Sequence, residues 1–292
     1  MAVNLGGFIS ATFDPLTGGK PDKVEYLVVA GGGSGGSTNG GGGGAGGLLQ
    51  AIDFPVVAGT ALTVTVGAGG AGVGSGLGNN GANSVFSSIT SVGGGAGALN
   101  TPGVGGSSGG SGTNARSLAI PGQGFAGSHG YYGTAATYYL GGGGGGSGSI
   151  GCIPQSYSRY IGGHGGTGTC SVITGSRVLY AGGGGGCVLD DNGGSTTYIV
   201  PGKGAAGGGN GAAEQRAGNT LSATSGRPNS GSGGGGAVFY RQTTSGSGGS
   251  GIVIIRYPAS QSPPIATTGS PQINYADGYQ IYSFINSGTI TF

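Results

Sequence analysis

Residues 24–33 of the chain read VEYLVVAGGG, an apolar and β-branched run that ends directly in glycine. The same order, strand-forming residues and then glycine, recurs at 61–67 (ALTVTVG) and at 84–95 (SVFSSITSVGGG), and residues 251–257 (GIVIIRY) close the series. Alternating valine, isoleucine, tyrosine and phenylalanine are typical of β-strands. We therefore expect a β-structured base from which several glycine-rich segments of the chain extend and to which they return.

Glycine accounts for 81 of the 292 residues and comes in uninterrupted runs such as 40–44, 141–146 and 182–186. Because glycine destabilises a helix by about 1 kcal/mol per position relative to alanine, we expect almost no α-helix. Collagen is excluded, since it needs glycine strictly at every third residue and abundant proline. A flexible linker is the alternative for such runs, but a linker would not carry strand-like segments between them.

A glycine run can adopt the polyproline II conformation, which has three residues per turn and no internal hydrogen bonds. Each backbone N–H and C=O must then pair with a neighbouring rod or with water. Rods without Cβ atoms can approach closely enough to bond on several sides, which explains why the runs are uninterrupted. The predicted fold is mostly irregular and β, with β-strands framing a bundle of polyglycine II helices.

Three regions differ in composition. Residues 1–23 have ordinary glycine content and read as an N-terminal attachment arm, with a frayed terminus as the alternative. Residues 24–258 form the glycine-rich β/polyglycine II domain. Residues 259–292 begin with a linker that contains Pro263 and Pro264 and end in two alternating strands around Asn286-Ser287-Gly288, which we interpret as a C-terminal β-hairpin.

The charge and cysteine content exclude several classes of protein. The formal net charge is +2 and the ten Lys and Arg residues are scattered, so nucleic-acid binding has no electrostatic support. No stretch approaches the roughly 18 apolar residues of a membrane span, and residues 1–19 lack the Lys or Arg of a secretory signal. Cys152, Cys170 and Cys187 form an odd set without CxxC spacing, so we expect free thiols made in a reducing cytoplasm.

Motifs for catalysis or cofactor binding fail on closer reading. Residues 26–36 fit a strand followed by GxGxxG, but five glycines follow at 40–44 where a dinucleotide-binding fold needs a helix. Lys203 lacks the following Ser or Thr of a phosphate-binding loop, and Asp190-Asp191 lacks the alternating carboxylates of a calcium loop. The chain has only two histidines. We expect no enzyme activity, no cofactor and no metal.

Four segments carry a family resemblance: residues 24–33, residues 81–95, residues 249–257, and residues 278–292. Together they resemble the glycine-rich domain of tailed-phage tail and fibre structural proteins. The alternation of glycine runs with tyrosine-rich segments is similar to the polyglycine II sandwich of T-even-like phage tip adhesins, whose loops bind bacterial receptors. The resemblance implies a bacteriophage virion protein of the distal tail or fibre, assembled in the host cytoplasm, and no catalytic residues.

The same resemblance implies the partners. They would be other tail or fibre subunits, bound through the N-terminal arm, and a bacterial surface receptor, either protein or glycan. Nucleic acid and membrane insertion are not implied.

Tyrosine gathers in the segments least like the scaffold, and six of the 14 tyrosines fall between Tyr131 and Tyr160. Tyr and Arg are enriched at binding hot spots, which favours receptor binding; aromatic rings that cap the rod ends are the alternative. The predicted receptor-binding residues are Tyr131, Tyr132, Tyr138, Tyr139, Tyr157, Arg159, Tyr160, Tyr240 and Arg241. Two further functions stay open: a purely architectural virion protein for decoration or tail assembly, and an ice-binding protein.

Overall fold

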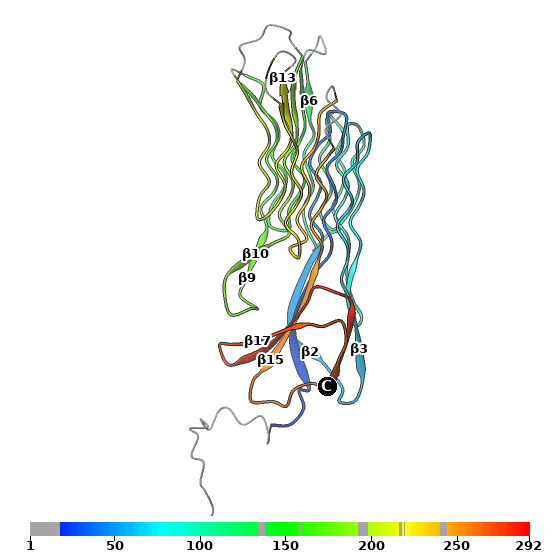
Figure 1. Ribbon diagram of the computed structural model, residues 1–292, viewed down its shortest axis with the longest axis vertical. Helices are drawn as coiled ribbons and strands as arrows, with labels where there is room; N and C mark the ends of the chain where they lie inside the picture. The colour runs from blue at the N-terminus through cyan, green and yellow to red at the C-terminus, as the bar shows by residue number, and fades with distance from the viewer. Residues whose placement is uncertain are drawn as a thin grey trace, which may run out of the picture.

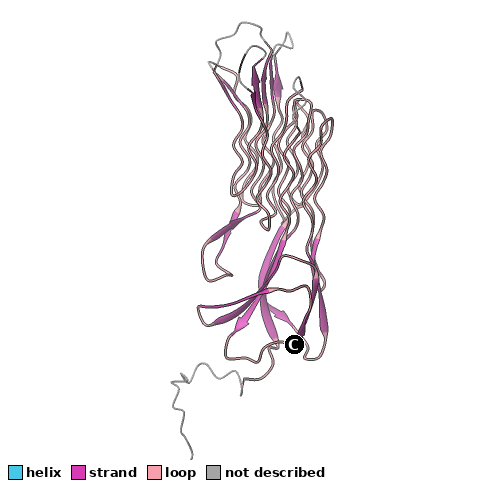
Figure 2. Cartoon of the chain, in the orientation of Figure 1, coloured by secondary structure: helices cyan, strands magenta, loops and turns pink. Residues whose placement is uncertain are grey.

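The structure is a computed structural model that describes residues 18–133, 138–157, 159–191, 198–215, 218, 220–239 and 244–292. It is elongated: a bundle of extended rods rises from a β-structured base, and short strands lie at the opposite, distal end (Figures 1 and 2). The described residues contain no helix, so none of them forms a helix that could span a membrane. The expected fold class, mostly irregular and β with almost no helix, is confirmed.

Two five-stranded sheets form the base. The first sheet has, in spatial order, β17 (Gln272–Ala276), β18 (Tyr279–Phe284), β15 (Ile252–Pro258), β1 (Lys23–Val29) and β2 (Leu48–Pro55). The second has β16 (Ala266–Thr267), β19 (Gly288–Thr291), β3 (Ala61–Thr65), β4 (Ser84–Phe86) and β5 (Ile89–Ser91). A separate hairpin joins β9 (Thr169–Ser171) to β10 (Val178–Tyr180). The strands predicted within 24–30, 61–66 and 251–257 are therefore present. The single strand predicted at 84–89 is wrong: a turn at Ser87-Ser88 divides it into β4 and β5, which pair antiparallel.

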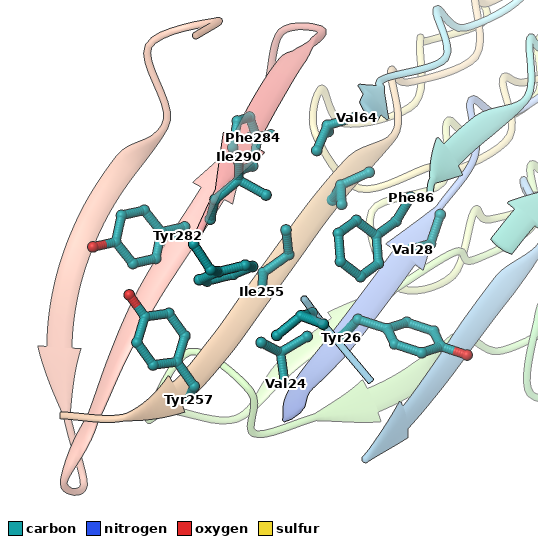
Figure 3. Packing of buried hydrophobic residues seen from close by; sticks show 13 residues of the cluster. Val24, Tyr26, Val28, Val64, Phe86, Ile255, Tyr257, Tyr282, Phe284 and Ile290 are labelled. Atoms are coloured by element: carbon teal, nitrogen blue, oxygen red, sulfur yellow. The ribbon is translucent and has the colours of Figure 1, made fainter. Parts of the chain in front are cut away.

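Apolar side chains from both sheets fill the space between them (Figure 3). From β1, Val24, Tyr26 and Val28 point into this core, where they meet Phe86 of β4 and Ile290 of β19. Alternation at period two places the other residues of β1 on the opposite face, where Leu27 and Val29 pack in a second cluster that includes Tyr180 of β10. Burial on both faces explains why β1 and β15 are almost continuously apolar.

The predicted C-terminal hairpin around residues 286–288 is wrong. Strand β18 pairs with β15 and β17, whereas β19 pairs with β3 and β16, so the two strands belong to different sheets. The turn that does form a hairpin lies earlier, at Asp277-Gly278, where φ is 52° and 79°. Two consecutive left-handed residues are typical of the turn that joins β17 to β18. The reason is burial: β18 lies between β17 and β15 and packs on both faces, with Phe284 in the core between the sheets and Ile281 in the second cluster.

Rod 31–37 shows how the glycine-rich segments are held. Its N–H groups donate hydrogen bonds of 2.9–3.0 Å in three sets, each set made of every third residue. The first set bonds to segment 76–82, the second to 246–249 and the third to 41–44. A period of three, with a different neighbour on each side, is what the polyproline II conformation produces. The predicted side-by-side packing of the rods is confirmed.

Rod 40–47 is enclosed on all sides. Its N–H groups donate bonds of 2.8–3.0 Å to segments 231–237, 92–98 and 142–145, and its carbonyl groups accept bonds from segments 30–36, 107–110 and 184–187. All residues of the rod are buried. A Cβ on any glycine of the 40–44 run would come closer to a neighbouring backbone atom than the 3.0 Å that real Cβ atoms respect. The six neighbours therefore explain why this run contains nothing but glycine.

Rods at the surface follow a different rule. In segment 162–168, the glycines at 162, 163, 165 and 166 are buried, whereas His164 and Thr167 are exposed. Ala68 and Ala71, three residues apart on another rod, are exposed in the same way. On these rods a large side chain is therefore accepted at the one position in three that faces solvent, whereas buried rod positions hold at most small side chains, such as those of Ser34 and Ala45.

Substitution of a buried glycine tests this packing. A Cβ at Gly184 would overlap the carbonyl oxygen of Gly234, and one at Gly143 that of His164, whereas a Cβ at Gly74 has no heavy atom within 4 Å. Gly184→Ala should therefore lower the free energy of unfolding by about 1–3 kcal/mol, and Gly74→Ala should change it by less than about 0.5 kcal/mol. Thermal unfolding followed by circular dichroism measures both; equal melting temperatures would show that the run behaves as a linker.

The three cysteines are free thiols in different surroundings. Cys152 and Cys170 are exposed and Cys187 is buried. Burial raises the pKa of Cys187 from 9.0 to about 12, so the folded chain keeps this thiol protonated at pH values at which the unfolded chain releases the proton. Its contribution to stability is complete below about pH 9 and is lost as the pH rises toward 12.

A disulfide reagent such as 5,5′-dithiobis(2-nitrobenzoate) should distinguish these thiols at pH 8. Thiolate availability and access control the reaction, so Cys152 and Cys170 should react within minutes and Cys187 only after denaturation. Cys187→Ser is the control: it should remove the slow reaction and leave the fast one unchanged. Rapid labelling of Cys187 in the native protein would contradict the close packing of the rods.

Candidate functional site

The distal ends of the rods carry side chains again, and there the chain forms short strands (Figure 1). One sheet has, in spatial order, β14 (Thr220–Leu221), β13 (Ala213–Gln215), β11 (Val188–Asp190), β7 (Tyr138–Leu140) and β6 (Tyr131–Tyr132). Beside it β12 (Ile199–Val200) pairs in parallel with β8 (Tyr160–Ile161). These strands prolong the rods, so the rigid bundle fixes their positions.

Three of the predicted tyrosines form a stack across β6, β7 and β8. The ring centroids of Tyr131 and Tyr138 are 5.9 Å apart and their planes differ by 22°. On the other side of Tyr138, the centroid of Tyr160 lies at 4.3 Å with an interplanar angle of 21°. Burial raises the pKa of Tyr138 and of Tyr160, and the carboxylate of Asp190 adds to the rise at Tyr160. These phenols therefore lose their protons at a higher pH than a free tyrosine does.

A second pair lies on the other side of β6 and β7. Tyr132 is opposite Tyr139 in the register of the two strands, and their rings stack with centroids 6.2 Å apart. Tyr139 also packs on a buried cluster that includes Cys187 and Leu189, and Tyr138 and Tyr160 pack on the cluster of Leu140, Val188 and Ala213. The half-buried tyrosines therefore close the ends of the rods, as the capping interpretation expects.

The remaining predicted residues are more accessible. Tyr131 is 41% exposed, Tyr132 50% and Tyr157 96%. The guanidinium carbon of Arg159 lies 5.3 Å from the ring centroid of Tyr198, which is itself 62% exposed. Tyr198 was missed from the sequence because it stands outside the Tyr131–Tyr160 cluster. Tyr240 and Arg241 lie outside the described residues.

Two buried carboxylates at the same end were also missed. Asp190 ends β11 and Glu214 lies in the neighbouring strand β13, and each is no more than 2% exposed. Their strands pair in parallel, with Leu189 opposite Glu214 and Asp190 opposite Gln215. Within the described part of the chain, no group of three or more His, Cys, Asp or Glu side chains could hold a metal ion.

His129, which precedes the tyrosine pair in sequence, is engaged by Arg116. The guanidinium Nε donates a hydrogen bond of 3.1 Å to Nδ1 of His129. Partial burial, and then the positive charge of Arg116, lower the pKa of this imidazole. The neutral imidazole of His129 therefore accepts a hydrogen bond from Arg116, which ties the segment that precedes Tyr131 to residue 116.

Comparison with protein families agrees with this architecture. A family model described as a glycine-rich domain matches residues 11–258. The chain belongs to this family. No protein with curated annotation matches it significantly. The matched region ends with β15, although the strands that follow, β16–β19, complete both sheets of the base.

Alanine substitutions can separate capping tyrosines from accessible ones. Tyr138 lies between two rings and on an apolar cluster, so Tyr138→Ala should cost about 1–3 kcal/mol of folding free energy. Tyr157→Ala, at a site 96% exposed, should cost less than about 0.5 kcal/mol. Differential scanning calorimetry measures both. If Tyr138→Ala melts at the native temperature, the stack does not close the rods.

Proposed function

We propose that the chain is a virion structural protein of a tailed bacteriophage, a tail-fibre or tail-tip adhesin whose distal end binds a receptor on the host cell surface. The observation that carries the proposal is the concentration of exposed aromatic and arginine side chains, among them Tyr131 and Tyr132 of β6. Strand β6 lies at the end of the rods opposite the base (Figure 1). The resemblance of residues 24–33, 249–257 and 278–292 to phage tail and fibre proteins supplies the biological context.

The arrangement suits recognition for a physical reason. Loops that bind well are those that a rigid scaffold positions, since less conformational entropy is lost on binding. Each rod is bonded to several neighbours, so the segments at the distal end begin and end on fixed backbone. Tyrosine adds a large amphipathic surface with few rotatable bonds. Among the predicted residues, Tyr131, Tyr132, Tyr157 and Arg159 are the best candidates for direct contact.

An architectural virion protein is the second candidate. It is favoured by the half-buried state of Tyr138, Tyr139 and Tyr160, whose rings stack on each other or on apolar clusters at the rod ends. In that function the exposed residues nearby would contact other virion subunits. The two functions differ in whether the distal end is accessible on the assembled particle.

Binding of the fluorescently labelled protein to a panel of bacterial strains tests the adhesin function. On any strain that binds, the double variant Tyr131→Ala/Tyr132→Ala should lose about 30-fold in affinity, which corresponds to about 2 kcal/mol. The matched control is Tyr275→Ala, because this tyrosine is 56% exposed but lies on β17 in the base.

Each outcome decides between the candidates. If both variants lost the same amount of binding affinity, the receptor-binding site would not lie at the distal end. Absence of binding to every strain, together with antibody labelling that finds the distal end covered on intact particles, would favour the architectural function.

A further inference from the structure

The outer face of the first sheet, opposite the core between the two sheets, is only partly covered. The hairpin of β9 and β10 lies on this face, where Ile173 and Tyr180 pack in the second cluster. Arg256 holds the turn of the hairpin, since its Nη1 donates a hydrogen bond of 3.2 Å to the carbonyl of Val172. Beside the hairpin the face is open, and a groove of about 410 Å³ lies between β9 and residues 50–52 of β2.

Strand β2 is the last strand of this sheet, so within the described part of the chain no strand pairs with its outer edge. The N–H of Ala30 donates a bond of 3.1 Å to the carbonyl of Gly47, and the bonds of an antiparallel ladder alternate along each strand. The N–H of Gln50 therefore points away from β1. Leu48, two residues earlier, has the same direction, because its N–H bonds to the carbonyl of Gln123 at 3.0 Å.

The groove also exposes apolar surface. Ile52 of β2 is 69% exposed, and Val172, which follows β9, is 53% exposed. Edge strands are usually protected by charge, proline or an irregular backbone. Strand β2 has these features at the end farthest from the rods, where Asp53 has a φ of 59° and Pro55 has no N–H. Residues 50–52 have none of them, so they are suited to receive an added strand.

The sequence contains a segment with the composition of such a strand. Residues 1–17 lie outside the described residues, and within them residues 8–13 read FISATF, without a charge. Apolar residues alternate with hydroxyl residues in this segment, in the order Ile9, Ser10, Ala11, Thr12 and Phe13. Alternation at period two with β-branched and aromatic residues is typical of a strand with one apolar face. That face matches the exposed apolar surface of the groove.

The start of the described chain indicates which copy can receive the segment. The N–H of Ser262 donates a bond of 3.2 Å to the carbonyl of Gly19, and Nζ of Lys20 donates one of 2.7 Å to the carbonyl of Pro263. These contacts continue the pairing of β1 with β15 beyond the end of β1 that is farthest from the rods. The chain thus leaves the base in a direction away from its own groove. Residues 1–17 can span up to about 56 Å when extended, which is enough to reach a neighbouring molecule.

We propose that residues 8–13 of one copy of this chain bind as an added strand in the groove of a second copy, between β2 and β9. The added strand bonds to the backbone of Gln50, and its apolar face covers Ile52 and Val172. Because each copy supplies one segment and one groove, the contact is head-to-tail and generates a closed ring or a filament. The proposal concerns the base and does not depend on what the distal end binds.

Disulfide cross-linking between copies tests the contact. The exposed thiols are first removed by Cys152→Ser and Cys170→Ser, and Ile52→Cys is then combined with a cysteine in the segment. The three segment variants are Ser10→Cys, Ala11→Cys and Thr12→Cys. Mild oxidation should give covalent oligomers on a non-reducing gel, most efficiently at alternate positions, because alternate side chains of a strand lie on the same face.

The matched control replaces Ile52→Cys by Ile273→Cys, since this residue is 55% exposed but lies in β17 at the opposite edge of the sheet. It should give no more cross-linking than the segment cysteine alone. A mixture of ¹⁴N- and ¹⁵N-labelled protein identifies the copies that are joined. Cross-links confined to single copies would overturn the proposal in favour of a segment that folds back on its own chain. No cross-link at any position, or equal cross-linking in the control, would show that the groove does not bind the segment.

Sedimentation velocity tests the assembly without cross-links. The full chain should sediment as an oligomer, and a chain that lacks residues 2–16 as a monomer. Gln50→Pro removes the N–H that points away from β1 but leaves the pairing of the two strands, so it should weaken association at least about tenfold. Gln50→Ala keeps this N–H and should associate like the native chain.

Phe13→Asp repeats the test outside the base, so it decides the question even if Gln50→Pro does not fold. It places a charge on the apolar face of the segment and should also give a monomer. A monomeric full chain, or an oligomer that persists without residues 2–16, would show that the proposal is wrong.

Discussion

The structure depends on hydrogen bonds between rods whose backbones are in contact. In rod 40–47, every N–H from residue 40 to residue 47 donates to a neighbouring segment. The backbone groups that would bond to each other within a helix therefore bond to adjacent rods instead. Along the 40–44 run this needs neighbouring backbones closer than a Cβ permits, as the overlaps at Gly42 and Gly44 show. Glycine is therefore the packing residue of this protein, in the way that leucine and valine are in an ordinary core.

Such a bundle requires its ends to be fixed. Each ordered residue costs about 1–2 kcal/mol of conformational entropy, and glycine is at the upper end of that range. A single rod could not offset this cost, because it has no internal bonds. The base supplies the constraint: β1 and β15 pair directly, with Val28 opposite Val253, and their apolar faces are buried on both sides. Rods that begin at adjacent strands are then held at bonding distance from the start.

The same packing rule decides where chemistry can be displayed. Inside the bundle only small side chains fit, such as those of Ser34 and Ala45, which are fully buried. On its faces a larger side chain can stand at every third residue, as at His164 and Thr167. Large side chains of different kinds are found in the turns and strands at the rod ends, where the stacked tyrosines lie. A scaffold that accepts only small residues in its interior and larger side chains at one end suits a protein whose proposed function is to contact a surface.

The sequence alone determined the absence of helix, the strands that frame the glycine runs and the accumulation of tyrosine between 131 and 160, because these follow from local propensity and from period-two alternation. The tertiary structure alone decided which rods are neighbours, since a glycine run has no side chain to specify its partner or its register. It also decided that β18 and β19 join different sheets, because burial on both faces of β18 outweighed the local turn signal at 286–288. The stack of Tyr131, Tyr138 and Tyr160 likewise required the packed bundle, which brings together three strands that the sequence separates.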